Sequence, residues 1–377
     1  MKKSANSLHC SVRNTAESVD VTALARVRLA RTHPEAALAA RGLQTPVEIA
    51  LKTVSEAGSF DSWIKLAPVG AEATAQRELM VDSGSPCLIH PYCEDFEALP
   101  GFTADYQILQ PCVTEPWGCP ARILRGPISL PLVGGGFLRI DDCTFFACTA
   151  KNADDERTAN FGCGAIAPWL RFGDGIAMQS PLTYCMPPPV VEFDFVAESL
   201  HSADGSVQTD YASRMYLHAD MPPGFRTFDI LRGSRWMTIG VKALSIAGQT
   251  TSWPSDPAAV AMIDTGGTCV FLSDPGEFLC QGAYPDPARN PDWTSKSKCC
   301  ETVACALSIT LGGAASTYSY TIDPASLPES ARERTLVMCR ENEYMRGLPG
   351  LNTGGISLLV NRLAIDYAGM QVGWQAK

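Results

Sequence analysis

The stretches Glu78–Ser85 (ELMVDSGS) and Val260–Gly267 (VAMIDTGG) are two versions of one pattern, and their aspartates lie 182 positions apart. In each, an apolar run leads into an Asp, which is followed by a hydroxyl residue and then by Gly. This order predicts a strand that ends in a tight turn and holds a carboxylate at its tip. Because one copy falls in each half of the chain, we expect a duplicated fold in which Asp82 and Asp264 meet at a shared interface.

The composition is that of a large globular protein with a substantial core. Of the 377 residues, 46% are hydrophobic and 19% are charged, which is too few charges for a disordered chain. The 31 Gly and 27 Pro residues favour a mostly β protein, because both residue types punctuate strands. No apolar run approaches the roughly 18 to 20 residues that span a bilayer, so we expect no membrane anchor.

Charge is distributed unevenly along the chain. Residues 1–50 hold seven Lys and Arg against four Asp and Glu, whereas the whole chain has a net charge of −10. The acidic remainder argues against nucleic-acid binding, which usually needs a basic surface. The basic extension 1–50 has moderate helical character between Val21 and Gly42. We expect either a prosegment that covers the paired carboxylates, as in a zymogen, or a loose terminus.

Fifteen cysteines bear on the compartment of the protein. This density fits a set of disulfide bonds formed in an oxidising compartment, although buried thiols are the alternative, and the odd number leaves at least one thiol unpaired. Zinc is not expected, because the cysteines form no paired C-x-x-C arrangement and the five His residues form no cluster with ligand spacing. No cofactor or metal is expected.

Several further segments extend the pattern into a family resemblance. Asn160–Gly164 (NFGCG), Met237–Gly248, Leu348–Gly350 and Leu363–Trp374 occur in the order and spacing of plant-type, nepenthesin-like members of the pepsin family. Over about residues 60–377 the chain therefore resembles the pepsin-like aspartic proteases. The two Asp turns and the C-terminal hairpin are the most specific elements of this resemblance.

The resemblance implies a mostly β, bilobal pepsin-like acid protease fold, with two similar antiparallel β lobes and a cleft between them. We expect the first lobe at 60–190 and the second at 191–377. The implied activity is that of an aspartic endopeptidase, a hydrolase that binds an extended peptide by strand-like contacts. A chain that carries both Asp motifs needs no second copy to complete its site, so we expect a monomer.

Asp82 and Asp264 are the expected catalytic pair. Two carboxyl groups a few Å apart share one proton over a broad acidic range, so one acts as a base on water while the other acts as an acid on the scissile carbonyl. Ser83 and Thr265 are expected to hydrogen-bond across the lobe interface. The complete set of residues that we expect to orient the pair is Ser83, Gly84, Ser85, Thr265, Gly266 and Thr268.

Three features depart from the family pattern. Trp117 is the candidate for the flap residue over the site, where the family usually carries Tyr, and its indole N–H could cover the dyad as a phenol does. Gly267 stands where the family places Ser or Thr, and the missing hydroxyl should alter how the dyad shares its proton. Finally, the family would show another apolar-apolar-Gly loop after the segment Gly173–Ile176, whereas this chain continues with Ala177–Pro181.

These departures leave two other functions open. The first is a catalytically silent binding or inhibitor protein on the same scaffold, and the second is an enzyme that uses the paired acids for other acid-base chemistry. The expected partner is a peptide or protein substrate. The family and the cysteines indicate the secretory pathway, but the residues after Met1 do not resemble a signal peptide, so an intracellular location stays open.

Overall fold

A computed structural model describes most of the chain between residues 46 and 377. The described ranges are 46–56, 59–72, 75–91, 105–116, 118–149, 159–165, 170–172, 175–185, 187–196, 212–234, 236–246, 248–253, 259–267, 270–273, 299–300, 306–313, 316–327, 336–339 and 349–377. The extension 1–50, except for its last five residues, lies outside these ranges, and so do Trp117 and Thr268. No helix among the described residues is both long and apolar enough to cross a membrane.

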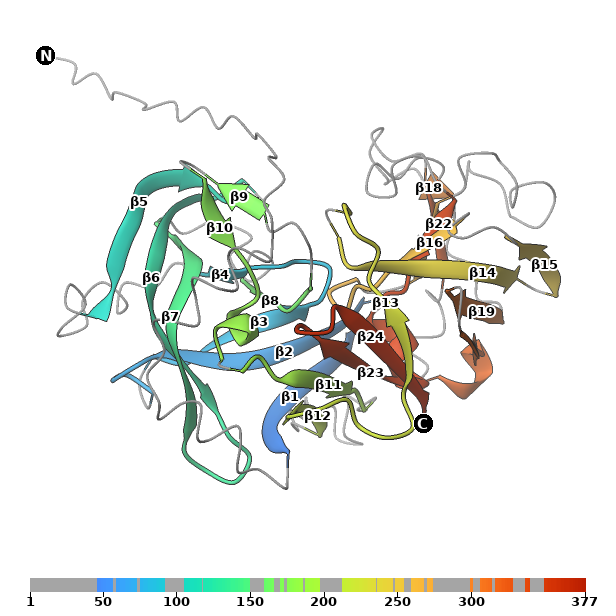
Figure 1. The fold of residues 1–377 in the computed structure, drawn as a ribbon, viewed down its shortest axis with the longest axis horizontal. Coiled ribbons are helices and arrows are strands. Elements are labelled where there is room, and N and C mark those ends of the chain that lie inside the picture. Colours follow the sequence, from blue (N-terminus) through green and yellow to red (C-terminus); the bar gives the residue numbers. More distant parts are fainter. Residues whose placement is uncertain are drawn as a thin grey trace, which may run out of the picture.

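The fold is mostly β, as the composition predicts, and its strands form two large sheets and one small one (Figure 1). In hydrogen-bonded order, the first sheet consists of β13 (Arg226–Asp229), β24 (Gln371–Ala376), β23 (Asn361–Asp366), β11 (Val190–Asp194), β12 (Ser213–His218), β1 (Val47–Glu56), β2 (Ser59–Pro68), β3 (Arg77–Asp82), β8 (Asn160–Gly162), β4 (Leu88–His90), β7 (Phe137–Cys148), β6 (Pro120–Pro131) and β5 (Gln107–Thr114).

The second large sheet has nine strands. In order these are β18 (Cys299–Cys300), β21 (Leu336–Cys339), β17 (Val270–Ser273), β22 (Gly350–Asn352), β16 (Ala259–Met262), β14 (Thr238–Ile246), β19 (Leu307–Gly312) and β20 (Thr317–Ile322), with β15 (Gln249–Ser252) paired to β14. The small sheet pairs β9 (Leu170–Phe172) with β10 (Ile176–Met178). In the described ranges, the short 3-10 helices are η1 (Pro181–Tyr184), η3 (Pro324–Ser326) and η5 (Gly355–Leu359).

The first sheet curls back on itself. Besides its neighbours β1 and β3, β2 pairs with β6 through Ala67↔Ser129 and Pro68↔Ile128, so the strands from β2 to β6 form a barrel-like ring. In Figure 1, β5, β6 and β7 lie at one end of the molecule and β14, β16 and β22 at the other, with β11, β23 and β24 between them. In the C-terminal hairpin β23–β24, β23 pairs with β11 of the first sheet, which lies far from it in sequence.

The local pattern around each aspartate is repeated in the two large sheets. β3 pairs in parallel with β8, and β16 pairs in parallel with β22. In each case the strand that follows the Asp, β4 or β17, pairs antiparallel with that same neighbour. The duplication that the two Asp stretches predict is thus present in the strand pairing. Ile176–Met178, which includes the start of the stretch that departs from the family pattern, pairs with Leu170–Phe172 in the small sheet.

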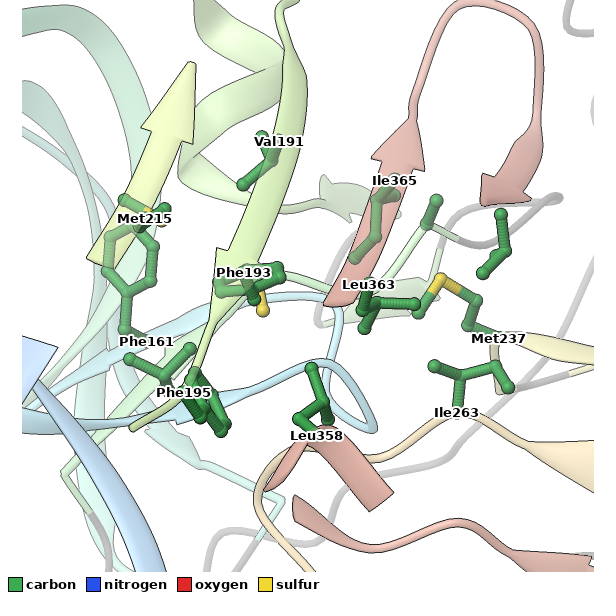
Figure 2. Packing of buried hydrophobic residues seen from close by; sticks show 14 of the residues in the cluster. Phe161, Val191, Phe193, Phe195, Met215, Met237, Ile263, Leu358, Leu363 and Ile365 are labelled. Atoms are coloured by element: carbon green, nitrogen blue, oxygen red, sulfur yellow. The ribbon is translucent and has the colours of Figure 1, made fainter. Parts of the chain in front are cut away.

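One large apolar cluster extends across the two large sheets. Figure 2 shows Phe161 and Phe193 of the first sheet on one side of this core and Met237 and Ile263 on the other, with Leu363 between them. All five side chains are fully buried, and each such burial stabilises the fold by about 1.5 to 3 kcal/mol. This core holds the ends of β3 and β16 in place.

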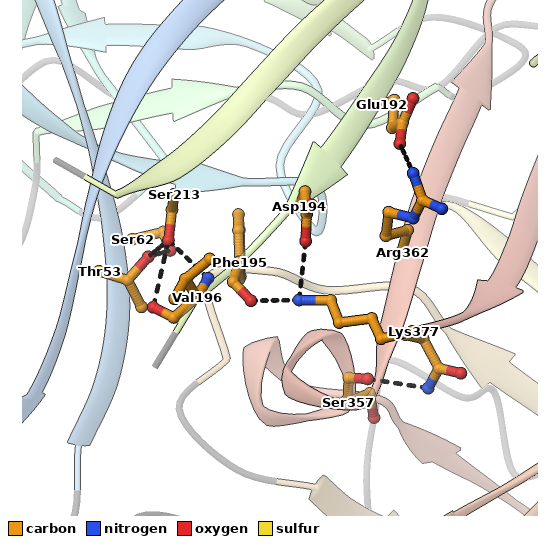
Figure 3. A network of polar contacts seen from close by, with 11 residues as sticks. Thr53, Ser62, Glu192, Asp194, Phe195, Val196, Ser213, Ser357, Arg362 and Lys377 are labelled. Atoms are coloured by element: carbon orange, nitrogen blue, oxygen red, sulfur yellow. Dashed lines mark hydrogen bonds and ion pairs between the residues drawn. The ribbon is translucent and has the colours of Figure 1, made fainter. Parts of the chain in front are cut away.

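Buried polar groups within the first sheet are hydrogen-bonded to one another. The hydroxyl of Thr53 lies 3.0 Å from that of Ser62 and 2.6 Å from that of Ser213 (Figure 3). Ser213 also accepts a hydrogen bond from the backbone N–H of Val196 at 2.8 Å. These contacts join β1, β2 and β12 in the sheet interior, where an unpaired hydroxyl would be costly.

The structure does not support the disulfide bonds that the number of cysteines predicts. No two cysteines in the described part of the chain lie at disulfide distance, and Cys87, Cys143, Cys163 and Cys185 are free thiols. Burial raises the pKa of Cys87 and Cys185 to about 12. Cys87, Cys143 and Cys163 are buried, as the alternative prediction has it, and Cys185 is partly buried. None of the four provides an argument for an oxidising compartment.

Candidate active site

Asp82 and Asp264 lie together at the junction of the two large sheets. β3 ends at Asp82, and β16 ends at Met262, two residues before Asp264. Both side chains are largely buried, with exposed fractions of 5% and 9%. A Cβ atom placed on Gly84 would lie 2.7 Å from Oδ1 of Asp264 and 2.9 Å from Oδ1 of Asp82. The two carboxyl groups therefore converge on the same turn.

Four hydrogen bonds tie the two turns together through the hydroxyl residues that follow each aspartate. The backbone N–H of Ser83 donates to Oγ1 of Thr265 at 2.9 Å, and the N–H of Thr265 donates to Oγ of Ser83 at 3.0 Å. Each hydroxyl in turn donates to a backbone carbonyl before the other aspartate, Ser83 to Ile263 at 3.0 Å and Thr265 to Val81 at 2.8 Å. The two side chains lie where the sequence predicts contacts across the interface.

Glycine is required on both turns because the opposing carboxyl group leaves no room for a side chain. A Cβ atom on Gly266 would lie 2.7 Å from Cγ of Asp82, just as one on Gly84 would lie 2.7 Å from Cγ of Asp264. Real Cβ atoms essentially never come this close to another heavy atom. Gly84 and Gly266 thus let each backbone turn approach the other aspartate.

Backbone N–H groups hold Oδ1 of each aspartate. Asp264 Oδ1 accepts from the N–H groups of Gly266 and Gly267 at 2.9 and 3.0 Å. Asp82 Oδ1 accepts from the N–H of Ser85 at 3.1 Å. Ser85 contributes to the site through this backbone group, while its hydroxyl hydrogen-bonds the Cys87 thiol.

Two asparagines that the sequence analysis did not single out hold the other oxygen of each aspartate. Nδ2 of Asn160 donates to Oδ2 of Asp82 at 2.6 Å, and Nδ2 of Asn352 donates to Oδ2 of Asp264 at 2.6 Å. Both asparagines are buried. A signal was present in the sequence, because each Asn stands two residues before a Gly, in Asn160–Gly162 and Asn352–Gly354.

Asn352 supplies Asp264 with the hydrogen-bond donor that a hydroxyl residue at position 267 would otherwise provide. Gly267 lacks the hydroxyl that the family pattern has at this position, and Thr268, one of the residues that we expected to orient the pair, lies outside the described residues. The amide of Asn352 donates to the carboxyl of Asp264 in its place. β22 begins at Gly350, and the turn beside Asp264 is formed by Thr353 and Gly354, with Thr353 Oγ1 accepting from Asp264 N.

Burial and mutual repulsion change the acidity of the site. Loss of hydration raises the pKa of Asp82 well above its ordinary value, and the charge of Asp264 and a hydrogen bond between the two carboxyl groups raise it further. The hydrogen bond from Asn160 and the N–H of Gly84 act in the opposite direction. Asp82 therefore keeps a proton to a higher pH than an exposed carboxyl group does.

The arrangement can hold one proton between two fixed carboxyl groups, which is what acid-base chemistry on a bound water requires. Among the described residues, no group of three or more His, Cys, Asp and Glu side chains is arranged to hold a metal ion. The candidate flap residue, Trp117, lies outside the described residues. No protein-family model matches the chain, and no curated protein matches its sequence.

Proposed function

We propose that the protein is an aspartic endopeptidase with a bilobal, pepsin-like fold, in which Asp82 and Asp264 hydrolyse peptide bonds. The observation that carries this proposal is the pair of buried carboxyl groups on two turns that are hydrogen-bonded to each other through Ser83 and Thr265. Such an arrangement fixes both acids and favours the singly protonated pair.

In the proposed reaction, a water molecule lies between the two carboxyl groups. The ionised carboxylate takes a proton from this water as its oxygen attacks the scissile carbonyl carbon, and the protonated carboxyl group donates to the carbonyl oxygen. The tetrahedral intermediate then breaks down: the carboxyl group that took the proton of water donates it to the leaving nitrogen, the C–N bond breaks, and a hydroxyl of the intermediate returns a proton to the other carboxylate. The raised pKa of Asp82 supports its role as the group that holds the proton.

The domain arrangement is part of the same proposal. Residues 60–190 would form the first lobe and 191–377 the second, with an extended peptide bound across the two Asp turns as an added strand. The basic extension 1–50 would act as a prosegment whose positive side chains pair with the carboxyl groups. A monomer suffices for this site, because one chain supplies both aspartates.

The test is cleavage of a mixed peptide library between about pH 2.5 and 7 by the native chain, Asp82→Asn and Asp264→Asn. We expect cleavage at acidic pH and a loss of about 10³-fold or more in each variant, because each removes one partner of the acid-base pair. Asp141→Asn is the matched control, since Asp141 is exposed on β7 and pairs with Arg139 at 2.7 Å. It should cleave like the native chain.

The proposal fails if the native chain cuts nothing at any pH, even after residues 1 to about 50 are removed. A silent binding or inhibitor protein would then be the better interpretation. An enzyme with other acid-base chemistry would be indicated if peptides and statine-type inhibitors are ignored while Asp82→Asn abolishes a different activity.

A further inference from the structure

The two asparagines beside the aspartates occupy equivalent positions in the two sheets. Asn160, in the parallel pair β3–β8, lies opposite Met80, which is two residues before Asp82. Asn352, in the parallel pair β16–β22, lies opposite Met262, which is two residues before Asp264. Each donates its amide hydrogen to Oδ2 of the aspartate at 2.6 Å. The contact is thus built twice, from strands far apart in the sequence.

An amide N–H differs from a hydroxyl as a partner for a carboxyl group. A hydroxyl can donate to a carboxylate oxygen or accept a proton from a carboxylic acid, whereas the NH₂ group of Asn only donates. A carboxyl oxygen that faces this NH₂ group accepts a hydrogen bond and cannot carry the proton. Each asparagine, in this orientation, therefore favours the ionised form of the carboxyl group that it faces.

The space around Gly267 fits this exchange of an amide for a hydroxyl. A Cβ atom on Gly267 would lie 3.2 Å from Oδ2 of Asp264 and also 3.2 Å from Oδ1 of Asn352. A side chain at position 267 would therefore point at the same carboxyl oxygen that the Asn352 amide already contacts. The amide and a hydroxyl at 267 compete for one place, and in this chain the amide fills it.

The two asparagines differ in how firmly their amides are oriented. Oδ1 of Asn352 accepts a hydrogen bond from the N–H of Gly354 at 2.9 Å, which fixes its NH₂ group toward Asp264. Oδ1 of Asn160 is buried and has no hydrogen-bond partner among the described residues. The Asn160 amide can therefore turn over and present its oxygen to a protonated Asp82, whereas the Asn352 amide cannot do so without breaking a second hydrogen bond.

We propose that Asn160 and Asn352 are positioning residues that decide where the shared proton of the dyad lies, with Asn352 holding Asp264 ionised and Asn160 tolerating a protonated Asp82. This inference rests on the proposed peptidase function, because it assigns the base to Asp264 and the acid to Asp82. The buried setting of Asp82 and the charge of Asp264, which raise the Asp82 pKa, agree with the assignment.

Two thiols also lie near the pair. Asp82 and Asp264 act on each other, and the Asp82 charge acts on the thiols of Cys87 and Cys163 as well. Burial raises the pKa of Cys87 to about 12 and that of Cys163 well above its ordinary value. Both thiols therefore stay neutral at acidic pH, and the titration of the site belongs to the two carboxyl groups.

The experiment compares the pH profiles of kcat/KM for the native chain, Asn352→Leu and Asn160→Leu. Leucine fills the space of Asn but cannot donate a hydrogen bond. We expect Asn352→Leu to raise the lower apparent pKa of the profile by about one unit, because the ionised carboxylate loses a charge-assisted hydrogen bond. Asn160→Leu should move the upper apparent pKa by less, since the Asn160 amide can serve both protonation states of Asp82.

A rescue variant distinguishes positioning from a general structural role. Asn352→Ala should raise the lower apparent pKa as Asn352→Leu does, and it replaces Asn352→Leu in the comparison if that variant does not fold. Combining it with Gly267→Ser should restore the native value, because the new hydroxyl points at Oδ2 of Asp264. The matched control is Asn361→Leu, in which a buried amide that donates to Ser357 and accepts from Tyr318 is removed. It should lower stability and leave both apparent pKa values unchanged.

Titration of ¹³C-labelled carboxyl groups by NMR measures the same two pKa values without any substrate. If the native chain cleaves nothing, the proposed function fails, and the NMR titration of Asn352→Leu against Asn361→Leu still decides the inference. The positioning role is overturned if Asn352→Leu, like the control Asn361→Leu, leaves the lower pKa at its native value. The assignment of the proton to Asp82 is overturned if Asn160→Leu shifts the pKa of Asp82 as much as Asn352→Leu shifts the pKa of Asp264.

Discussion

At the scale of single residues, the two Asp turns have nearly the same parts, and most of these parts are backbone groups. Oδ1 of Asp264 receives two N–H groups from its own turn, and Ser83 and Thr265 join the turns to each other. Such contacts need the backbone to come close to the carboxyl groups. The geometry of the pair therefore depends on residues that have no side chain at all, Gly84 and Gly266.

Replacing Gly84 by Ala tests this dependence. The new methyl group would lie 2.7 Å from Cγ of Asp264, so the carboxyl groups or the turn must move. A displacement of about 1 Å in a catalytic pair typically costs about 100-fold, and we expect a loss of that size in kcat/KM. Gly134→Ala is the control, because its methyl group would meet nothing within 4 Å. Equal activity of the two variants would contradict the role of Gly84.

The positions of both aspartates could be predicted from the sequence, because an apolar run followed by Asp, a hydroxyl residue and Gly specifies a strand tip and a turn. Asn160 and Asn352 could not be predicted in the same way. An Asn shortly before a Gly is common in turns, and nothing local shows that its amide faces an aspartate about 80 residues earlier in the chain. The contact exists only because parallel pairing brings the two strands into register.

At the scale of elements, the strands beside the aspartates are too short for sequence periodicity. β8 and β22 have three residues each, and period-2 alternation needs at least four to be recognised. Parallel pairing also joins segments distant in sequence, so no hairpin turn announces it. For this reason the sequence predicts the Asp strands but does not predict that β8 and β22 are their parallel neighbours.

A buried carboxylate on β11 holds three strands of the first sheet together. Oε2 of Glu192 lies 2.7 Å from Nε2 of His218 on β12, and Oε1 lies 3.0 Å from the guanidinium of Arg362 on β23 (Figure 3 shows the contact with Arg362). The Glu192 side chain is only 5% exposed. Both of its oxygens thus have partners, and this local cross-link joins the C-terminal hairpin to the rest of the sheet.

Glu192→Ala should lower the free energy of unfolding by about 2 kcal/mol, because the hydrogen bonds of its buried side chain to His218 and Arg362 are both lost. Urea denaturation followed by circular dichroism measures this change. The comparison is Asp141→Ala, which removes an ion pair with both side chains 54% exposed and should cost less than about 1 kcal/mol. Equal costs would show that the buried contact contributes no more than a surface pair.

At the scale of the whole molecule, the two large sheets share one core and therefore depend on each other. The apolar composition indicates such a core, but the sequence does not show that the C-terminal hairpin β23–β24 belongs to the first sheet, since its partner β11 lies about 170 residues away. Trp374 on β24 stacks on Tyr320 of β20 in the second sheet, with ring centroids 5.4 Å apart and an interplanar angle of 12°. The hairpin is thus a direct link between the sheets that carry the two aspartates.

Trp374→Ala should therefore affect both sheets at once. The side chain is fully buried, and its loss should lower the free energy of unfolding by about 3 to 5 kcal/mol. Because the core is continuous, urea denaturation followed by circular dichroism should still show one transition, at a lower midpoint. Phe137→Ala, at a side chain 42% exposed, should cost less than about 1 kcal/mol. Two separate transitions in Trp374→Ala would show that the sheets fold independently, and the alignment of Asp82 with Asp264 would then rest on the contacts of their turns alone.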